Sequence, residues 1–392
     1  MISNRQLFLS HLAQTSPSPL LIEIERAEGM YLYGPDGKKY MDLIAGISVS
    51  NLGHSHAEVV NAVKQQAEKY MHLMVYGEFV QSPQVMYATA LSKVLPATLN
   101  SVYFTNSGAE ATEGAMKLAK RLTGRRQFVH FKDAYHGSTQ GALSLMGDET
   151  FKRKFRPLLP GTLQLDFNSV QDLDKITAAT AAVVVEPVKA ESGVTLPEDG
   201  YLKLLRKKCD ETGALLIFDE CQTGLGRTGK LFAFEHYGVV PDVLLLAKAF
   251  GGGMPLGAFI SSQEKMKVLS DNPILGHITT FGGHPVCCAA GLAAFNVLQN
   301  DKLVAGVEAK GQLFDDLLVS PKIKAKRRKG LMMAVEFADF EQNKAIIDRC
   351  IEKGILTDWF LFTPHCMRIA PPLIITEEEI RHACSVILSC IE

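Results

Sequence analysis

Short apolar runs recur along the middle of the chain, with helical patterns between them. They occupy residues 101–105, 127–130, 181–186, 214–219 and 242–247. The last three runs are apolar at almost every position, which is typical of strands that are buried on both faces of a parallel sheet. Alternation of such strands with helices predicts an α/β fold, with a large, doubly wound, mostly parallel sheet.

The two ends of the chain have a different pattern. Residues 29–43 alternate around the turn cluster Pro35-Asp36-Gly37, which predicts a hairpin. From about residue 286, helical stretches surround the apolar run 330–337, and Thr376 precedes three glutamates, as at a helix start. We therefore predict a large domain at residues 51–285 and a smaller α+β domain at residues 286–392, with the N-terminal segment 1–50 packed against the smaller one.

Composition narrows the functional classes. The chain has 392 residues, 47% of them apolar and 21% charged, with a net charge of −1. This balance is ordinary for a globular enzyme and favours neither nucleic acid nor an anionic membrane as a partner. The basic cluster at residues 322–329 stands alone, so a charged strand edge is the better interpretation. No apolar run approaches the roughly 18 residues that span a bilayer, and no secretory signal is recognisable.

Cysteines and histidines give no sign of a disulfide framework or a metal site. The eight cysteines form no CxxC pair, which indicates a reducing, cytoplasmic location. His54 and His56 share a short loop, but two such residues alone are weak evidence for a metal. We therefore expect no metal.

Ligands of open α/β sheets bind at the carboxyl ends of the strands, and three features of the sequence lie there. The first is the segment 106–110, between a predicted strand and a predicted helix. Gly108 lets the backbone approach an anion closely, and the free N–H groups of the helix start would face that anion. Taken alone, an ordinary helix capped by Ser107 or Asn106 is the better explanation of the same residues, because such turns are common.

The other two features are a carboxylate and a lysine. Asp219 ends one buried run, where it suits a protonated ring nitrogen, a helix cap or a salt bridge. Lys248 follows the next run and precedes three glycines; in a dry site its amine becomes a nucleophile toward carbonyls, whereas at the surface it is merely solvated. An anion cradle, a carboxylate and an imine-forming lysine together meet the requirements of pyridoxal 5'-phosphate, PLP.

Residues 215–258, LLIFDECQTGLGRTGKLFAFEHYGVVPDVLLLAKAFGGGMPLGA, resemble the signature of class III aminotransferases of the ornithine and acetylornithine group. Matching motifs at residues 31–56 and 367–376 extend the resemblance over almost the whole chain. It implies a fold-type-I PLP transferase that works as a homodimer with shared active sites.

The resemblance also implies roles for individual residues. Lys248 matches the lysine that holds the cofactor as a Schiff base and moves the proton, and Asp219 matches the partner of the pyridine nitrogen. The other matches to cofactor-binding positions are Ser107, Gly108 and Ala109 for the phosphate, Tyr135 for ring stacking, Gln222 for the phenolic oxygen, and Thr280 for the phosphate of the neighbouring subunit.

On the substrate side, Glu186 and Glu191 match family glutamates. Arg368 matches the arginine that grips a substrate carboxylate and pairs with the second glutamate. Three departures concern the same pocket: Ser138 stands in place of a second carboxylate-binding arginine, Ile47 in place of a substrate-contacting tyrosine, and Lys189-Ala190 in place of Gln-Gly.

The expected function is therefore PLP-dependent transamination from an amino-acid donor, of the ω-amino type that acetylornithine and ornithine represent, to a 2-oxo acid. One alternative is an ω-amino acid or amine:pyruvate aminotransferase. Another is an aminomutase of the glutamate-semialdehyde type, which typically has methionine in place of Gln222. A cofactor-free scaffold is the third, but such a relative would be expected to lose Lys248 or Asp219, and both are present.

Overall fold

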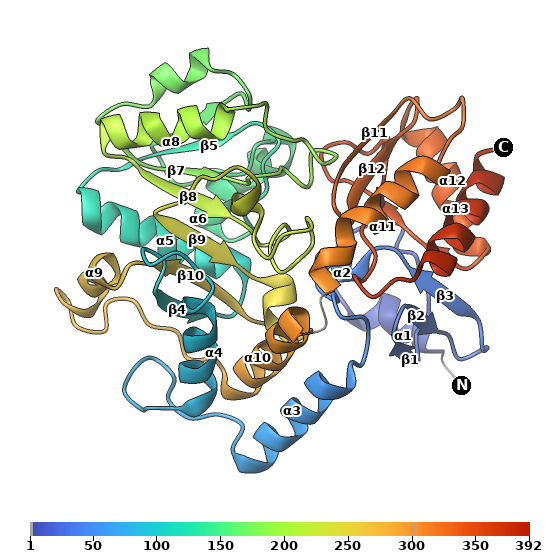
Figure 1. Ribbon diagram of the computed structural model, residues 1–392, viewed down its shortest axis with the longest axis horizontal. Coiled ribbons are helices and arrows are strands. Elements are labelled where there is room, and N and C mark those ends of the chain that lie inside the picture. The colour runs from blue at the N-terminus through green and yellow to red at the C-terminus, as the bar shows by residue number, and fades with distance from the viewer. Residues whose placement is uncertain (1–2, 301–302) are drawn as a thin grey trace.

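The computed structural model describes residues 3–300 and 303–392, and it contains a large sheet with helices on both faces (Figure 1). The seven strands lie in the order β4-β10-β9-β8-β7-β5-β6. Strand β10 is antiparallel to both of its neighbours, and the other pairs are parallel. The predicted doubly wound, mostly parallel sheet is thus confirmed. The strands are β4 (Ser101–Thr105), β5 (Gln127–Phe131), β6 (Thr162–Leu165), β7 (Thr180–Val185), β8 (Leu215–Asp219), β9 (Val243–Leu246) and β10 (Gly257–Ser261).

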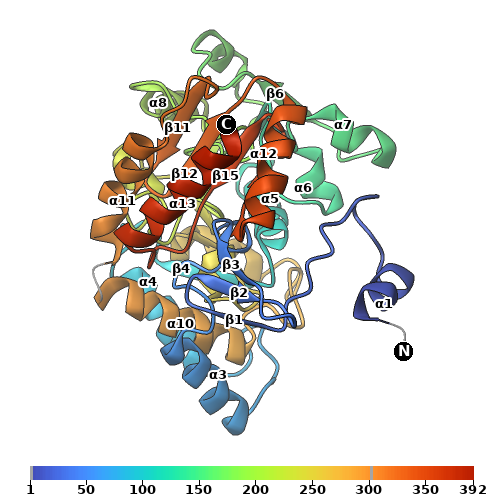
Figure 2. The same cartoon turned by 90° about the vertical axis from the view of Figure 1, so that its right-hand side faces the viewer.

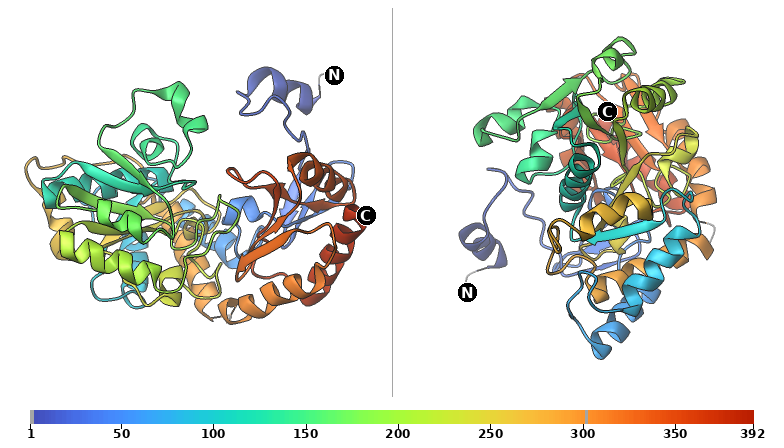
Figure 3. Two further views of the ribbon diagram at one scale, coloured as in Figure 1. Left: turned by 90° about the horizontal axis from the view of Figure 1, so that it is seen from above. Right: turned by 90° about the vertical axis from the view of Figure 1, so that its left-hand side faces the viewer.

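The predicted strands agree with the observed ones to within one residue at each end, and in β7, β8 and β9 every side chain is buried. Val183, Val185 and their counterparts on β8 and β9 pack on the side of α8 (Tyr201–Thr212). The intervening residues, Ala182 and Val184 among them, pack on the side of α5 (Gly108–Thr123). Burial on both sides explains why these runs are apolar without interruption; Figure 3 gives two further views of the layers.

Strands from the two ends of the chain share a second sheet. The predicted hairpin is present: β2 (Tyr31–Tyr33) pairs antiparallel with β3 (Lys39–Asp42), and β1 (Arg26–Glu28) pairs with β2. On its other side β3 pairs with β13 (Ile355–Leu356), so the N-terminal strands lie beside the C-terminal elements (Figure 2).

The third sheet has the order β11-β12-β15-β14, with β11 (Ala325–Lys329), β12 (Met332–Glu336), β15 (Cys366–Ile369) and β14 (Asp358–Trp359). The basic cluster lies on the edge strand β11, where Arg327 pairs with Glu336, as the strand-edge interpretation predicted. Helix α13 begins after Thr376, whose side chain forms a capping box with Glu379.

The longer helices are α1 (Asn4–His11), α3 (Ala57–Lys69), α4 (Ser82–Ser92), α5, α8, α10 (Pro285–Asn300), α11 (Leu303–Leu317), α12 (Phe340–Glu352) and α13 (Glu377–Ile391). The short ones are α2 (Ala45–Ser48), α6 (Gln140–Ser144), α7 (Glu149–Lys152), α9 (Gln263–Met266), η1 (Arg153–Phe155), η2 (Gln171–Lys175), η3 (Ala233–His236), η4 (Lys248–Gly251) and η5 (Lys267–Ser270). None of the described helices is long and apolar enough to cross a membrane.

A fully buried arginine links segments that lie far apart in the sequence. Arg227, in the loop after β8, donates to the carbonyls of Leu331 and Pro371 and to the side chain of Asn51. Asn51 in turn donates to the carbonyl of Leu225. One side chain from the middle of the chain thereby satisfies acceptors from its N-terminal and C-terminal parts.

Candidate active site

A cavity of about 490 Å³ opens at the carboxyl ends of β7, β8 and β9. The strands position its groups directly, because Asp219 is the last residue of β8, and Glu186 and Lys248 follow β7 and β9 closely. The residues that line it are Ser107, Gly108, Ala109, Tyr135, His136, Gly137, Ser138, Thr139, Glu186, Asp219, Cys221, Gln222, Ala247 and Lys248. A larger, mostly apolar hollow of about 740 Å³, between α1 and residues 19–24, contains none of the predicted site residues.

Most of the residues predicted to form a site thus meet in this one cavity. Glu191 and Arg368 lie next to it, since Gln222 hydrogen-bonds to Glu191. Thr280 does not line the cavity; it lies in an exposed loop between η5 and α10.

The start of α5 forms one wall of the cavity. Ser107 caps the helix by accepting a hydrogen bond from the Glu110 N–H, at 3.2 Å. The N–H groups of Gly108 and Ala109, one step earlier, have no acceptor within the helix. A side chain at position 108 would bring its Cβ within 2.8 Å of the Cys221 sulfur, so only glycine fits there. The wall therefore offers free N–H groups and the positive end of a helix to an anion.

Asp219 is held ionised by a histidine. His136 Nδ1 lies 2.8 Å from Asp219 Oδ2, and the Cys221 N–H donates to Oδ1. Burial opposes ionisation of Asp219, but the hydrogen bond and positive charge of His136 hold the pKa of this carboxyl below its usual value. Burial also disfavours the His136 cation, yet Asp219 raises the pKa of His136 overall. The site thus contains a buried, negatively charged carboxylate.

Lys248 lines the same cavity, near the charges of Asp219 and Glu191. Burial lowers the pKa of its amine, while the charges of Glu191, Cys221 and Asp219 act in the opposite direction. Within the described residues, its amine makes no hydrogen bond and no ion pair. Its backbone φ is +54°, a strained value for a residue with a side chain. An unpartnered amine with a lowered pKa is suited to attack a carbonyl.

Glu186 lines the same cavity, close enough to the Asp219–His136 pair for their charges to act on its carboxyl. Its carboxylate accepts hydrogen bonds from the backbone N–H groups of Tyr135 and Ala190, both at 3.2 Å. Burial raises the pKa of Glu186 to about 7, despite the nearby charge of His136. The carboxyl therefore holds the Tyr135 loop in place and changes its protonation near neutral pH.

Beyond Gln222 lies a buried ion-pair network. Arg368 donates from Nη1 and Nη2 to the two oxygens of Glu191, at 2.9 and 3.0 Å. Gln222 donates to the same carboxylate at 2.9 Å. Burial opposes the charge on Glu191, but Arg368 lowers the pKa of this carboxyl to about 2. The predicted pairing of Glu191 with Arg368 is present.

The structure also places the three departures noted in the sequence. Ser138 lines the cavity, and its hydroxyl lies 3.1 Å from the Tyr135 hydroxyl. Lys189 turns away from the cavity: it donates to the Lys132 carbonyl and lies over the Phe167 ring. Ile47 belongs to the short helix α2 and does not line the cavity. Lys189 therefore does not supply a cation in place of the missing arginine.

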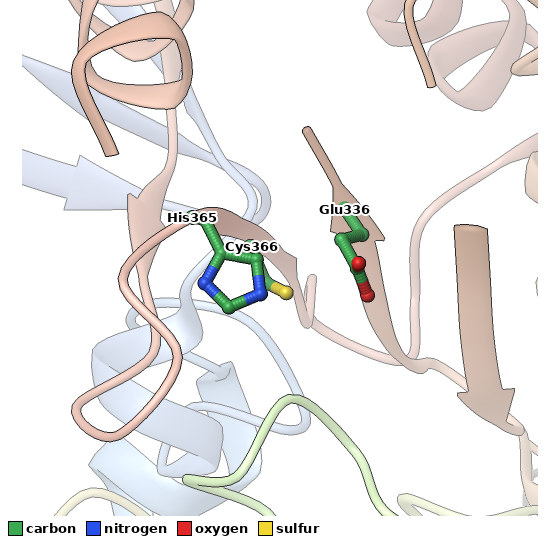
Figure 4. A group of neighbouring side chains, drawn as sticks. All are labelled: Glu336, His365 and Cys366. Atoms are coloured by element: carbon green, nitrogen blue, oxygen red, sulfur yellow. The ribbon is translucent and has the colours of Figure 1, made fainter. Parts of the chain in front are cut away.

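One group of possible metal ligands lies outside the cavity. Glu336, His365 and Cys366 come together where β12 ends and β15 begins, with their ligand atoms within 4.8 Å of one another (Figure 4). The guanidinium of Arg327 already contacts Glu336 at 2.6 Å and the Cys366 sulfur at 3.3 Å. Because a cation of the protein already occupies these acceptors, we assign no metal to this group.

Comparison with known proteins places this geometry in a family. The family model described as aminotransferase class-III matches residues 12–391. The chain belongs to the class III aminotransferases. It is accordingly a PLP-dependent enzyme that transfers amino groups, as the sequence resemblance implied.

Named class III relatives are similar over nearly their full length. The acetylornithine aminotransferase of Methanopyrus kandleri is 40% identical over 361 residues, which is 91% of this chain and 90% of the relative. That of Caldanaerobacter subterraneus subsp. tengcongensis is 38% identical over 93% of each chain. Among solved structures, the ornithine aminotransferase of Toxoplasma gondii, described with PLP in its active site, has 31% identity and a TM-score of 0.91, covering 98% of this chain and 92% of that one. A transaminase from Virgibacillus has 26% identity and a TM-score of 0.92, covering 99% and 98%.

Among the residues that contact the predicted site but were not identified from the sequence are two charged partners, His136 and Asp358. His136 stands next to Tyr135 in the same loop, but its bond to Asp219 spans 83 positions. Asp358 contacts Arg368 from the neighbouring strand. For His136, its position next to the predicted stacking residue Tyr135 was a signal that the sequence offered. For Asp358 the sequence offered no such signal.

Proposed function

We propose that this aminotransferase takes an amino-acid donor of the ω-amino, acetylornithine/ornithine-like type and a 2-oxo acid acceptor, with Lys248 as the covalent anchor of the cofactor. The observation that carries the proposal is the meeting of Lys248, Asp219 and the start of α5 in one cavity. The class of donor rests on the two acetylornithine aminotransferases that are similar over most of the chain.

The residues of the cavity fit PLP. The free N–H groups at Gly108 and Ala109, next to Ser107, suit the phosphate. Asp219 is an ionised acceptor for the ring nitrogen. Tyr135 lines the cavity and offers an aromatic surface to the pyridine ring. Its loop can approach α5 closely because residue 137 is glycine: a Cβ at this position would come within 2.6 Å of Ala109. The oxygen of Gln222 is buried and unpartnered among the described residues, and its nitrogen retains a second N–H for the phenolic oxygen.

Two side chains control protons in the proposed reaction: Asp219 holds one on the ring nitrogen, and Lys248 moves one at the substrate carbon. When bound, PLP accepts the electrons released at the amino-bearing carbon of the substrate. Asp219 keeps a proton on the ring nitrogen, and His136 keeps Asp219 ionised and oriented. The Lys248 amine would move the proton to and from the substrate carbon, a role for which a lowered pKa is suited.

On the substrate side, Arg368 is the proposed carboxylate-binding group. Its two terminal nitrogens hold Glu191 when no substrate carboxylate is present. A substrate carboxylate would replace Glu191 on the same two nitrogens, because bidentate geometry is shared by all carboxylates. Glu186 lines the cavity and holds the loop that carries Tyr135, because its carboxylate accepts a hydrogen bond from the Tyr135 N–H.

We expect weak use of 2-oxoglutarate relative to pyruvate. A dicarboxylate needs a second cation; Ser138 cannot supply one, and Lys189 is turned away from the cavity. Losing a charge-assisted contact typically costs about 1.5–3 kcal/mol, or roughly ten- to a hundredfold in affinity. Ser138→Arg should therefore improve kcat/KM for 2-oxoglutarate by up to that factor while changing that for pyruvate much less.

A donor panel assayed with each 2-oxo acid in turn measures this, with Ser138→Ala as the control for the loss of the hydroxyl alone. Tight use of 2-oxoglutarate by the wild type, unaffected by Ser138→Arg, would contradict the prediction. The same panel separates the second candidate, an ω-amino acid or amine:pyruvate aminotransferase. Ser138 in place of arginine favours that candidate.

We also propose a homodimer with shared active sites. Large apolar side chains are exposed before and within α4 and in the loop that carries Thr280, where a second copy would cover them. They are Met71, Phe79, Val80, Met86, Ile274 and Phe281. Thr280 is exposed in the same loop and does not line the cavity of its own chain, as expected for a residue that contacts the partner's cofactor phosphate.

Complementation between two variants tests the shared sites. Thr280→Glu places a negative charge near the phosphate and should weaken PLP binding by about tenfold or more. Lys248→Ala is expected to be inactive. Co-expressed chains should regain activity at limiting PLP, because one site of each mixed dimer combines a native Lys248 with a native Thr280. Mixtures no more active than Thr280→Glu alone would refute sharing.

The proposed division into segment 1–50, a cofactor-binding domain at 51–285 and a small domain at 286–392 is supported by the pairing of β3 with β13. Helix α10, which begins at Pro285, packs against α3 and α4 and links the two domains. A cytoplasmic location is supported by the eight cysteines, all of which are free thiols.

A further inference from the structure

Arg368 contacts two carboxylates, and the two occupy different edges of its guanidinium. Glu191 binds the terminal nitrogens Nη1 and Nη2. Asp358 accepts a hydrogen bond from Nε at 2.9 Å. Resting on the proposed function, in which Arg368 binds substrate, we propose that Asp358 is a positioning residue that keeps Arg368 aimed at a substrate carboxylate while Glu191 is displaced.

Strand pairing fixes Asp358 in this position. Asp358 on β14 lies directly opposite Arg368 on β15 in the antiparallel register. The preceding residue, Thr357, donates from its hydroxyl to the Arg368 carbonyl at 2.5 Å. Asp358 therefore moves only if the sheet moves. Glu191 lies in the loop after β7, outside the strand pairing, and besides Arg368 its carboxylate accepts a hydrogen bond from the Leu361 N–H.

Three contacts remain on Arg368 when Glu191 leaves. Asp358 holds Nε, the Trp359 carbonyl accepts from Nη2 at 3.2 Å, and the Phe360 ring lies 4.5 Å from the guanidinium carbon. All three come from consecutive residues and leave the edge between Nη1 and Nη2 free. A substrate carboxylate then meets a guanidinium that is already oriented, so it does not have to order a long, flexible side chain.

The charges of these groups also support a lasting contact of Arg368 with Asp358 and an exchangeable one with Glu191. The Arg368 side chain is 5% exposed, and a buried guanidinium without a counter-charge is costly. With Asp358 in place, the cation keeps one partner during the exchange of Glu191 for substrate. Burial raises the pKa of Asp358 to about 6, against the effect of Arg368, so this carboxyl is ionised at neutral and alkaline pH.

The role predicts a selective defect. Substrates with an α-carboxylate require Glu191 to leave, so they depend on the orientation that Asp358 maintains. A donor without that carboxylate leaves the Glu191–Arg368 pair closed and should not depend on Asp358. L-Alanine and isopropylamine form a matched pair for this test, because they differ only by a carboxylate in place of a methyl group.

The experiment compares single turnovers of the holoenzyme with each donor, followed through the cofactor's absorbance. Asp358→Ala should raise the half-saturating concentration of L-alanine by roughly tenfold, with a much smaller change in the limiting rate. Asp358→Asn keeps an acceptor for Nε and should restore most of the affinity. Isopropylamine should be unaffected by either variant. Asp315→Ala is the matched control, since Asp315 also pairs with basic side chains of the small domain and is 32% exposed, against 25% for Asp358.

Equal losses with both donors, or no loss with L-alanine, would overturn the role of Asp358. Failure of Asp358→Asn to do better than Asp358→Ala would do the same. Arg368→Lys tests the underlying function separately: if it left L-alanine binding unchanged, the assignment of Arg368 as the carboxylate-binding group would fail. Thermal unfolding of each variant reports whether the sheet remains intact.

Discussion

Lys248→Ala is expected to lower the rate of transamination by at least about 10³-fold while the protein still folds and binds PLP loosely. This substitution removes the Lys248 amine, which lies in the cavity, has a lowered pKa and makes no hydrogen bond or ion pair with the described residues. Folding should survive because alanine fits after a buried strand, and removing an unpaired amine leaves no partner unsatisfied.

Borohydride reduction of the holoenzyme, followed by peptide mapping, measures the anchor directly. The PLP label should appear on Lys248. Lys189 is a matched internal control, because burial also lowers the pKa of its amine, but its nitrogen donates to the Lys132 carbonyl and faces away from the cavity. Label on Lys189 or on any other lysine would require the assignment to be withdrawn.

Asp219→Asn is expected to slow the proton-transfer half-reaction by roughly 10²–10⁴-fold, with only a small loss of stability. The substitution keeps the shape of the side chain and one acceptor oxygen for the Cys221 N–H, but it replaces the oxygen that faces His136 with an NH2 group and removes the negative charge. Without that charge the ring nitrogen of PLP is no longer held protonated, so the electrons from the substrate carbon are accepted less readily.

Single-turnover rates, the PLP dissociation constant and the melting temperature of this variant separate catalysis from folding. Glu220→Gln is the matched control: Glu220 is the next residue, is equally buried, and accepts hydrogen bonds from Ala233 and Phe234 outside the cavity. It should retain the rate within a few-fold. A near-native rate for Asp219→Asn would contradict the role given to Asp219.

The sequence by itself determined five of the seven strands of the large sheet, all except β6 and β10, and the residues at their ends. Side chains that are buried on both faces must be apolar throughout, and that requirement is visible as an uninterrupted run in β7, β8 and β9. Because ligands bind where such strands end, the same runs led to Asp219 and Lys248. The resemblance to class III aminotransferases added the residues whose roles no local pattern reveals, such as Gln222 and Arg368.

Only the tertiary structure showed that His136 meets Asp219, which is 83 positions away. The resemblance implied that Arg368 pairs with Glu191, 177 positions away, but no local pattern indicated it. The position of the Lys189 amine, which does not replace the arginine that is absent at position 138, likewise depends on its contacts with the Lys132 carbonyl and the Phe167 ring. The pattern of apolar positions reports whether a residue is buried but not what it is buried against, because partners are chosen by strand order and loop path. Asp358 shows this most clearly, since its place on Arg368 follows from the pairing of β14 with β15.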